Sequence, residues 1–263
     1  MMDHVPVDEL PLQETWTPVG NGRVHAWVVG AGTPAEATAP LVVMLPGLGL
    51  PSYTVPTAQA LARSGTTCAV LDLPGFGRWG RLGSRPDITS IGQVAAAWVM
   101  ARARGRRIVV VGHSTGGQAA LGAALLLQEQ RPDVALVMAG PTFMPEHRRL
   151  RPLVAVTPAA YRDETLGEVV VLPDVARGHL GVLSVLRSGM RDAPEQRLVA
   201  LRVPLSLTAG VHDAYAPPHW LATLAAAAVR SPTVRTVVAP GSHNNLYTHP
   251  HEVMRVIADA VSG

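Results

Sequence analysis

The sequence contains no lysine, and all 22 basic side chains among its 263 residues are arginines. Schiff-base chemistry and lysine-assisted proton transfer need an amine, which this chain offers only at its N-terminus. The formal net charge is +3 at pH 7, and the arginines lie among acidic neighbours without forming a long basic stripe. The composition therefore excludes lysine-dependent lyases and argues against nucleic acid as a partner.

Cysteine and long hydrophobic runs are also scarce. Cys68 is the only cysteine, so no intrachain disulfide can form, and its apolar neighbours favour a buried structural thiol. No apolar run approaches the roughly 18 residues that span a bilayer. The acidic, proline-containing N-terminal segment lacks the basic and apolar regions of a secretory signal. We therefore expect a soluble cytoplasmic protein that does not bind membranes.

From Arg23 onward, short apolar runs alternate with segments of helical periodicity. Such alternation is typical of an α/β fold with a mostly parallel, doubly wound sheet covered by helices on both faces. A chain of this length with 48% hydrophobic residues can fill one core, so we expect a single domain over residues 1–263. The expected strands are 24–29, 41–45, 67–71, 107–111, 134–139, 203–208 and 234–238, and the expected helices are 55–63, 88–104, 116–130, 219–228 and 251–261.

The stretch 141–197 interrupts this alternation. It is rich in arginine and proline and contains no clear parallel strand, so we interpret it as a helical cap inserted over the sheet. Its patch 179–190 carries apolar residues at helical spacing, which would either line a substrate pocket or dock on the core. Within this patch we select Leu183 and Leu186 as candidate substrate-binding residues.

The motif Gly112-His113-Ser114-Thr115-Gly116-Gly117 stands between an expected strand and an expected helix. A bare Gly-x-Ser-x-Gly would mean little in a chain with 25 glycines, but this context is specific. A strand that turns into a helix within about three residues requires glycine on both sides and lifts the serine to the apex of a strained turn. The first turn of the helix aims unsatisfied backbone N–H groups at the same point. We therefore expect Ser114 to be a nucleophile.

A serine hydroxyl needs a base within hydrogen-bond reach, and histidine has the appropriate pKa. Of the ten histidines, His243 lies directly after the last expected strand, at the edge of the sheet where Ser114 lies, whereas His249 and His251 are expected to begin the terminal helix. Asp213 follows the preceding strand and would orient this histidine. The trio His212, Asp213 and His219 could instead suggest a metal site, but its spacing matches no helical or zinc-finger pattern. We expect neither a metal nor a cofactor.

With these features the sequence resembles the α/β-hydrolase superfamily over nearly its whole length. The resemblance implies an oxyanion hole made by the backbone N–H groups of Thr115 and Leu48, the latter within Leu45-Pro46-Gly47-Leu48-Gly49. Proline stands here where the family usually has histidine, which leaves the Leu48 donor intact. The segment Leu71-Asp72-Leu73-Pro74-Gly75-Phe76-Gly77 resembles the family's Asp-x-x-Gly-x-Gly turn, and we interpret Asp72 as structural.

The resemblance implies hydrolysis of a carboxylic ester, thioester or lactone through an acyl-serine intermediate, on a small-molecule substrate with an apolar portion. Acyl transfer to an alcohol, C–C bond hydrolysis and perhydrolysis use the same kind of site and stay open. A noncatalytic, ligand-binding member of the fold is the alternative from another class. Dehalogenases and epoxide hydrolases of this fold use an aspartate at the elbow, so Ser114 argues against both. The fold itself does not settle the substrate, and the oligomeric state stays open.

Overall fold

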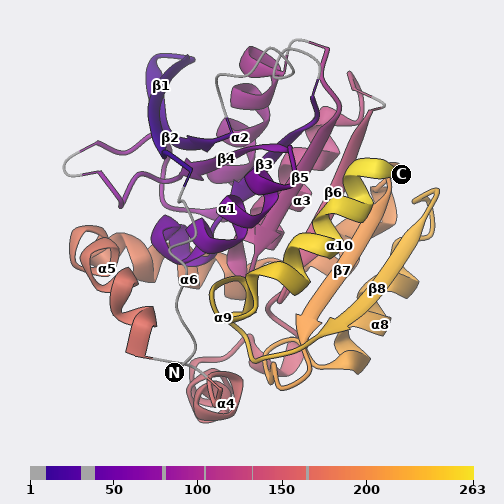
Figure 1. Cartoon of the computed structure of the whole chain (residues 1–263). Coiled ribbons are helices and arrows are strands. Elements are labelled where there is room, and N and C mark those ends of the chain that lie inside the picture. Colours follow the sequence, from indigo (N-terminus) through magenta and orange to yellow (C-terminus); the bar gives the residue numbers. More distant parts are fainter. Residues whose placement is uncertain (1–9, 31–38, 79–80, 104, 132, 164–165) are drawn as a thin grey trace, which may run out of the picture.

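An eight-stranded sheet runs through the protein (Figure 1). The computed structural model describes residues 10–30, 39–78, 81–103, 105–131, 133–163 and 166–263. The strands are β1 (Gln13–Val19), β2 (Gly22–Val29), β3 (Leu41–Leu45), β4 (Thr67–Asp72), β5 (Ile108–His113), β6 (Val134–Ala139), β7 (Leu205–Gly210) and β8 (Val234–Ala239). Their order is β1-β2-β4-β3-β5-β6-β7-β8; β2 pairs antiparallel with β1 and β4, and the other pairs are parallel. The predicted α/β class and mostly parallel sheet are confirmed.

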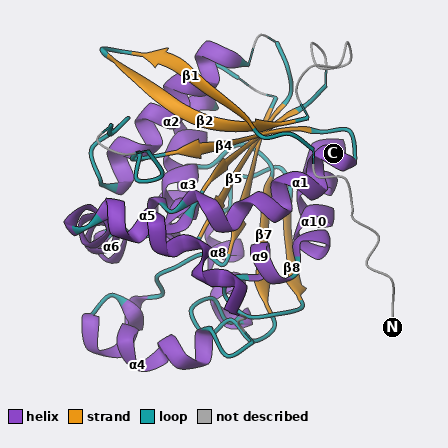
Figure 2. Cartoon of the chain, turned by 60° about the vertical axis from the view of Figure 1, so that its left-hand side comes forward, coloured by secondary structure: helices purple, strands orange, loops and turns teal. Residues whose placement is uncertain are grey.

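Helices cover both faces of the sheet. On one face α1 (Val55–Arg63) packs against α10 (Pro250–Ser262), and on the other α2 (Ile88–Arg102) packs against α3 (Thr115–Leu127), as Figure 2 shows. A further helix, α8 (Pro218–Ala227), contacts β7 and β8. Strands β3 to β7 are buried along their whole length, as expected for parallel strands between two helical layers. Cys68 is completely buried within β4, where burial raises the pKa of its thiol.

Strand β1 was not predicted by the sequence analysis. It lies at the edge of the sheet beside β2, and its side chains are mostly exposed or half-buried, so it lacks the apolar run of a central strand. A two-residue turn, Gly20-Asn21, joins β1 to β2, with Val19 opposite Gly22. Gly20 has φ 55°, which glycine adopts without strain. A Gly-Asn pair between two extended runs is a hairpin signal that could have revealed this strand.

We call residues 141–197 the cap segment. Its helices are α4 (Leu150–Ala160), α5 (Leu172–Gly178), α6 (Leu180–Arg191) and α7 (Pro194–Arg197), with 3-10 turns at Pro145–His147 and Leu166–Val171. Figure 1 places α4, α5 and α6 beyond the carboxyl ends of the strands. Within the described ranges, no single helix has the length and hydropathy to cross a membrane; Val169–Gly178 and Leu180–Arg191 meet those criteria only together and are bent by 96°.

Candidate active site

The chain turns sharply at Ser114, between β5 and α3. Ser114 has φ 55° and ψ −126°, a conformation that is strained for any residue with a side chain. A Cβ at Gly112 would lie 2.2 Å from the carbonyl oxygen of Gly116, and a Cβ at Gly116 would lie 2.2 Å from that of Leu45. Both positions therefore require glycine, because strand, helix and the neighbouring strand end are in contact here.

Asp213 and His243 lie side by side after the ends of β7 and β8. The Nδ1 of His243 is 2.9 Å from the Oδ2 of Asp213, and each residue is only 2% exposed. The Oδ1 of Asp213 accepts hydrogen bonds from the backbone N–H groups of Tyr215 and Ala216, at 2.9 and 3.2 Å. Since a carboxylate only accepts, the hydrogen lies on Nδ1 of His243. The Nε2 of this imidazole is then the nitrogen that can take a proton.

Ser114 and His243 line one pocket of about 120 Å³ at the carboxyl end of the sheet. The remaining lining residues come from the loop and turn after β3, the elbow, the cap segment and the loop after β8; they are Gly47, Leu48, Leu50, Tyr53, His113, Tyr161, Val171 and Asn244. None of them is an arginine, aspartate or glutamate. The structure therefore brings the candidate nucleophile and base into one largely uncharged pocket, with Asp213 behind the base.

Leu48 and Thr115, the candidate oxyanion donors, are in direct contact. The Leu48 N–H donates to the Thr115 hydroxyl at 2.7 Å. Leu48 has φ 53°, an uncommon conformation for leucine, and lines the same pocket as Ser114. Thr115 is the first residue of α3, so its N–H is one of the amino-terminal donors that the helix itself cannot pair.

The cap residues at the pocket differ from those that the sequence suggested. Leu183 is 45% exposed on α6, and Leu186 packs against a small apolar cluster that includes the cap residues Phe143 and Leu153. The buried residues of α6 are Val185 and Gly189, so the apolar spacing of this helix includes its docked face. Neither candidate lines the pocket, whereas Tyr161 and Val171 do.

Hydrogen bonds join the cap segment to the loops after β7 and β8. The His243 N–H donates to the carbonyl oxygen of Ala160, at the end of α4, at 2.9 Å. The Asp163 carboxylate accepts from the Ser242 hydroxyl at 2.8 Å and lies 2.6 Å from Nδ1 of His212. The bonds from His212 and Ser242 hold the pKa of the Asp163 carboxyl below its ordinary value. The cap is thus attached to the neighbours of the two candidate catalytic residues.

Asp72 lies at the end of β4, outside the lining of the Ser114 pocket. Its Oδ2 is 3.1 Å from Nδ1 of the buried His25, and its Oδ1 accepts from the Gly77 N–H at 3.0 Å. The Gly77 bond closes the turn from residue 72 to 77 and the His25 contact joins it to β2, in keeping with the structural role that we expected for Asp72.

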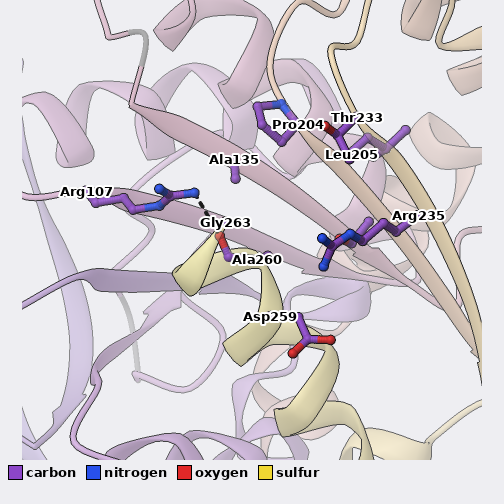
Figure 3. A pocket seen from close by; sticks show the side chains of 10 residues that line it. Arg107, Ala135, Pro204, Leu205, Thr233, Arg235, Asp259, Ala260 and Gly263 are labelled. Carbon is purple, nitrogen blue, oxygen red and sulfur yellow. Dashed lines mark hydrogen bonds between the residues drawn. The ribbon is translucent and has the colours of Figure 1, made fainter.

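A second pocket lies at the opposite end of the sheet (Figure 3). Arg107, Arg235 and Asp259 contribute to its lining, and Arg107 donates to the carbonyl oxygen of Ala260 at 3.2 Å. It shares no residue with the Ser114 pocket and so belongs to no part of the candidate active site. Among the residues that the structure describes, no group of three or more His, Cys, Asp or Glu side chains could hold a metal ion.

Comparisons with known proteins agree with the fold. Residues 42–256 match the model of the alpha/beta hydrolase family. A search of curated proteins returned no significant match. Similar solved structures include the enol-lactonase of Burkholderia xenovorans LB400, with 19% identity, 95% of this chain and 100% of that chain covered, and a TM-score of 0.68. Another is the N-formylmaleamic acid deformylase of Pseudomonas putida S16, with 17% identity, the same coverages and the same TM-score.

The carboxylesterase CesB of Bacillus subtilis is also similar, with 16% identity, 97% of this chain and 93% of that chain covered, and a TM-score of 0.67. At these identities the likeness establishes the fold and not the substrate. The family model covers most of the sheet, the elbow and the loops that carry Asp213 and His243. The chain therefore belongs to the alpha/beta hydrolase family.

Proposed function

We propose that the protein is a serine hydrolase that cleaves a carboxylic ester, thioester or lactone through an acyl-serine intermediate. One observation carries the proposal: Ser114 stands at the apex of a strained turn in the same pocket as His243, whose Nδ1 is bonded to the buried Asp213. The elements of nucleophilic catalysis are a nucleophile, a base and a group that orients the base. The esterase and lactonase folds among the similar structures support the same reaction class.

In the first half of the proposed reaction, the Ser114 hydroxyl attacks the substrate carbonyl carbon while Nε2 of His243 takes its proton. The Asp213 carboxylate stabilises the resulting imidazolium through Nδ1–H. The N–H groups of Leu48 and Thr115 donate to the oxyanion, and each such donor is worth about 3 to 4 kcal/mol in the barrier. Since the Leu48 N–H donates to the Thr115 hydroxyl in this structure, it must share its hydrogen with the oxyanion or redirect it.

In the second half, the intermediate collapses and the bond to the leaving group breaks. His243 returns its proton to the departing alcohol or thiol, which in a lactone stays attached to the acyl chain. A water molecule, deprotonated by the same imidazole, then attacks the acyl carbonyl. The acid is released, the proton returns to the serine oxygen, and Ser114 is regenerated.

The lining of the pocket favours an uncharged, apolar acyl or alcohol group. Leu48, Leu50 and Val171 contribute aliphatic surface, and burial lowers the pKa of His113 to about 3, so that this ring stays neutral. A carboxylate or phosphate on the substrate would find no arginine among the lining residues. We also keep the expectation of a cytoplasmic location, which cell fractionation would check.

A panel of ester, thioester and lactone substrates of graded chain length tests the proposal. The wild type is expected to hydrolyse neutral, apolar members best, and Ser114→Ala is expected to be inactive on all of them. Turnover of any panel member by Ser114→Ala at more than a tenth of the wild-type rate would contradict the assignment of the nucleophile. If an alcohol is added to the assay and its ester is released instead of the free acid, the reaction is acyl transfer.

The cap wall of the pocket is expected to set the preferred substrate length. Val171→Ala removes two methyl carbons from the lining, so kcat/KM should rise for substrates one or two carbons longer, by about tenfold relative to the preferred wild-type substrate. Val154→Ala makes the same chemical change at an exposed site of α4 outside the lining and serves as the matched control. Equal length profiles for the two variants would rule out Val171 as the residue that selects substrate length.

A further inference from the structure

Tyr53 and His113 form a buried hydrogen-bonded chain beside Ser114. The Tyr53 Oη lies 2.6 Å from the backbone N of Gly47 and 2.6 Å from Nδ1 of His113. The Nε2 of His113 lies 2.8 Å from the carbonyl oxygen of His243. Both side chains are buried. One continuous path of hydrogen bonds therefore links the loop after β3, the elbow and the loop after β8.

The direction of each bond in this chain is determined by its partners. The His243 carbonyl can only accept, so Nε2 of His113 carries the hydrogen. Burial and the neighbouring His243 lower the pKa of His113 to about 3, so the ring is neutral and its Nδ1 is an acceptor. The Tyr53 hydroxyl must then donate to Nδ1, while its oxygen accepts from the Gly47 N–H. Burial also raises the pKa of Tyr53, which keeps the hydroxyl protonated.

The loop that this chain holds is in direct contact with the nucleophile. A Cβ at Gly47 would lie 2.9 Å from the Cβ of Ser114 and 2.9 Å from the Tyr53 Oη, so the loop has almost no room to shift toward the serine. Gly47 is followed by Leu48, the proposed oxyanion donor. Before it stands Pro46, which has no N–H and no side-chain hydrogen-bonding group. The bond to Tyr53 therefore provides a side-chain anchor at this point of the loop.

We propose that Tyr53 and His113 are positioning residues that hold the Leu48 donor and the His243 backbone in register with Ser114. This inference rests on the proposed function, because it assigns the two residues a role in the same reaction. The Tyr53 hydroxyl fixes one end by bonding the Gly47 N–H, and His113 fixes the other by bonding the His243 carbonyl. Neither side chain exchanges a proton with the substrate. Their effect is to hold the loop after β3 and the loop after β8 at a fixed distance from the elbow.

Tyr53→Phe tests the role because it removes one hydroxyl and keeps the ring. The matched control is Thr57→Val, which removes another buried hydroxyl, four residues further along, whose 2.6 Å bond to the Leu246 carbonyl lies outside the pocket. The readout is the second-order rate constant for labelling of Ser114 by a fluorophosphonate, which needs the base and the oxyanion donors but no identified substrate. We expect Tyr53→Phe to slow labelling by about 10- to 100-fold, less than complete loss of one donor.

The rate constant for labelling of Thr57→Val is expected to lie within about twofold of the wild-type value. This should hold even if Thr57→Val lowers the melting temperature by as much as Tyr53→Phe does. Equal labelling rates for the two variants would reduce Tyr53 to a structural role and overturn the inference. A wild type that is not labelled at all would overturn the proposed function, and the positioning role with it. On the best ester of the panel, Tyr53→Phe should lower kcat with KM changed by less than about threefold, since the ground state does not use the oxyanion donors.

Nitrogen NMR of the histidine rings tests the hydrogen-bonded chain without any reaction. In the wild type, His113 should remain the neutral Nε2–H tautomer between about pH 5 and 8, the range in which an ordinary histidine titrates. In Tyr53→Phe, the Nδ1 resonance should move because its donor is lost. A wild-type His113 that is protonated on Nδ1, or that titrates in this range, would contradict the proposed arrangement.

Discussion

His243→Ala is expected to lower kcat by about four to six orders of magnitude. The change removes the proposed base from the pocket that Ser114 lines, and His113 cannot replace it because its Nε2–H is engaged by the His243 carbonyl. The fold should survive, since β8 and α10, which flank this loop, keep their own packing. Steady-state turnover of the best panel substrate, with circular dichroism of the same sample, measures the effect.

His25→Ala is the control for this variant. His25 is equally buried and also bonds an aspartate, Asp72, but it lies outside the Ser114 pocket. Its loss should reduce stability and leave turnover of the folded protein near wild type. If His243→Ala keeps more than a tenth of wild-type turnover, the barrier has risen by less than about 1.4 kcal/mol, and another residue must be the base.

Asp213→Asn is expected to lower kcat by about 10⁴-fold. Asparagine can donate its amide hydrogen to Nδ1 of His243, which would place the imidazole hydrogen on Nε2 and leave no acceptor facing Ser114. The substitution also removes the negative charge that stabilises the imidazolium. The backbone bonds from Tyr215 and Ala216 can still reach the amide oxygen, so the loop is expected to keep its shape. Substrate turnover and the crystal structure of the variant would separate these effects.

The chain offers a matched control for the acid. Asp72→Asn changes another buried Asp–His contact, of 3.1 Å, outside the pocket, and should leave kcat within a few-fold of wild type. Asp174 in the cap segment is a further acid to compare; it accepts from Ser52 and pairs with Arg177, and burial raises the pKa of its carboxyl. A near-normal Asp213→Asn together with an inactive Asp174→Asn would transfer the orienting role to the cap.

The parts of the fold that were predictable are those whose burial leaves a pattern in the sequence. Strands buried on both faces must be continuous apolar runs, so β3 and β6 were predicted with the bounds that the structure shows. The elbow was predictable because steric contact leaves only glycine at residues 112 and 116. The edge strand β1 gave a weaker signal, since pairing on one side and exposure on the other allow polar residues such as Gln13 and Glu14.

The placement of the candidate site residues was predictable as far as each residue follows a strand end. Ser114, Asp213 and His243 all lie just beyond carboxyl ends of parallel strands, and topology alone brings those ends to one edge. Tyr53 does not follow a strand end directly. Its role depends on where a short 3-10 turn places its hydroxyl relative to His113, and the sequence does not show this. Helical spacing showed that α6 is amphipathic, but it could not show that the pocket is reached by Val171 and not by residues of α6.

Covalent labelling with a fluorophosphonate, followed by peptide mapping, tests the central claim most directly. The reagent forms a stable bond only with a serine whose hydroxyl is activated by a base in a site that stabilises an oxyanion. We predict one adduct per chain, on the peptide that contains Ser114, and no adduct in Ser114→Ala. Mapping of the adduct to any other serine, or equal labelling of the wild type and Ser114→Ala, would contradict the account.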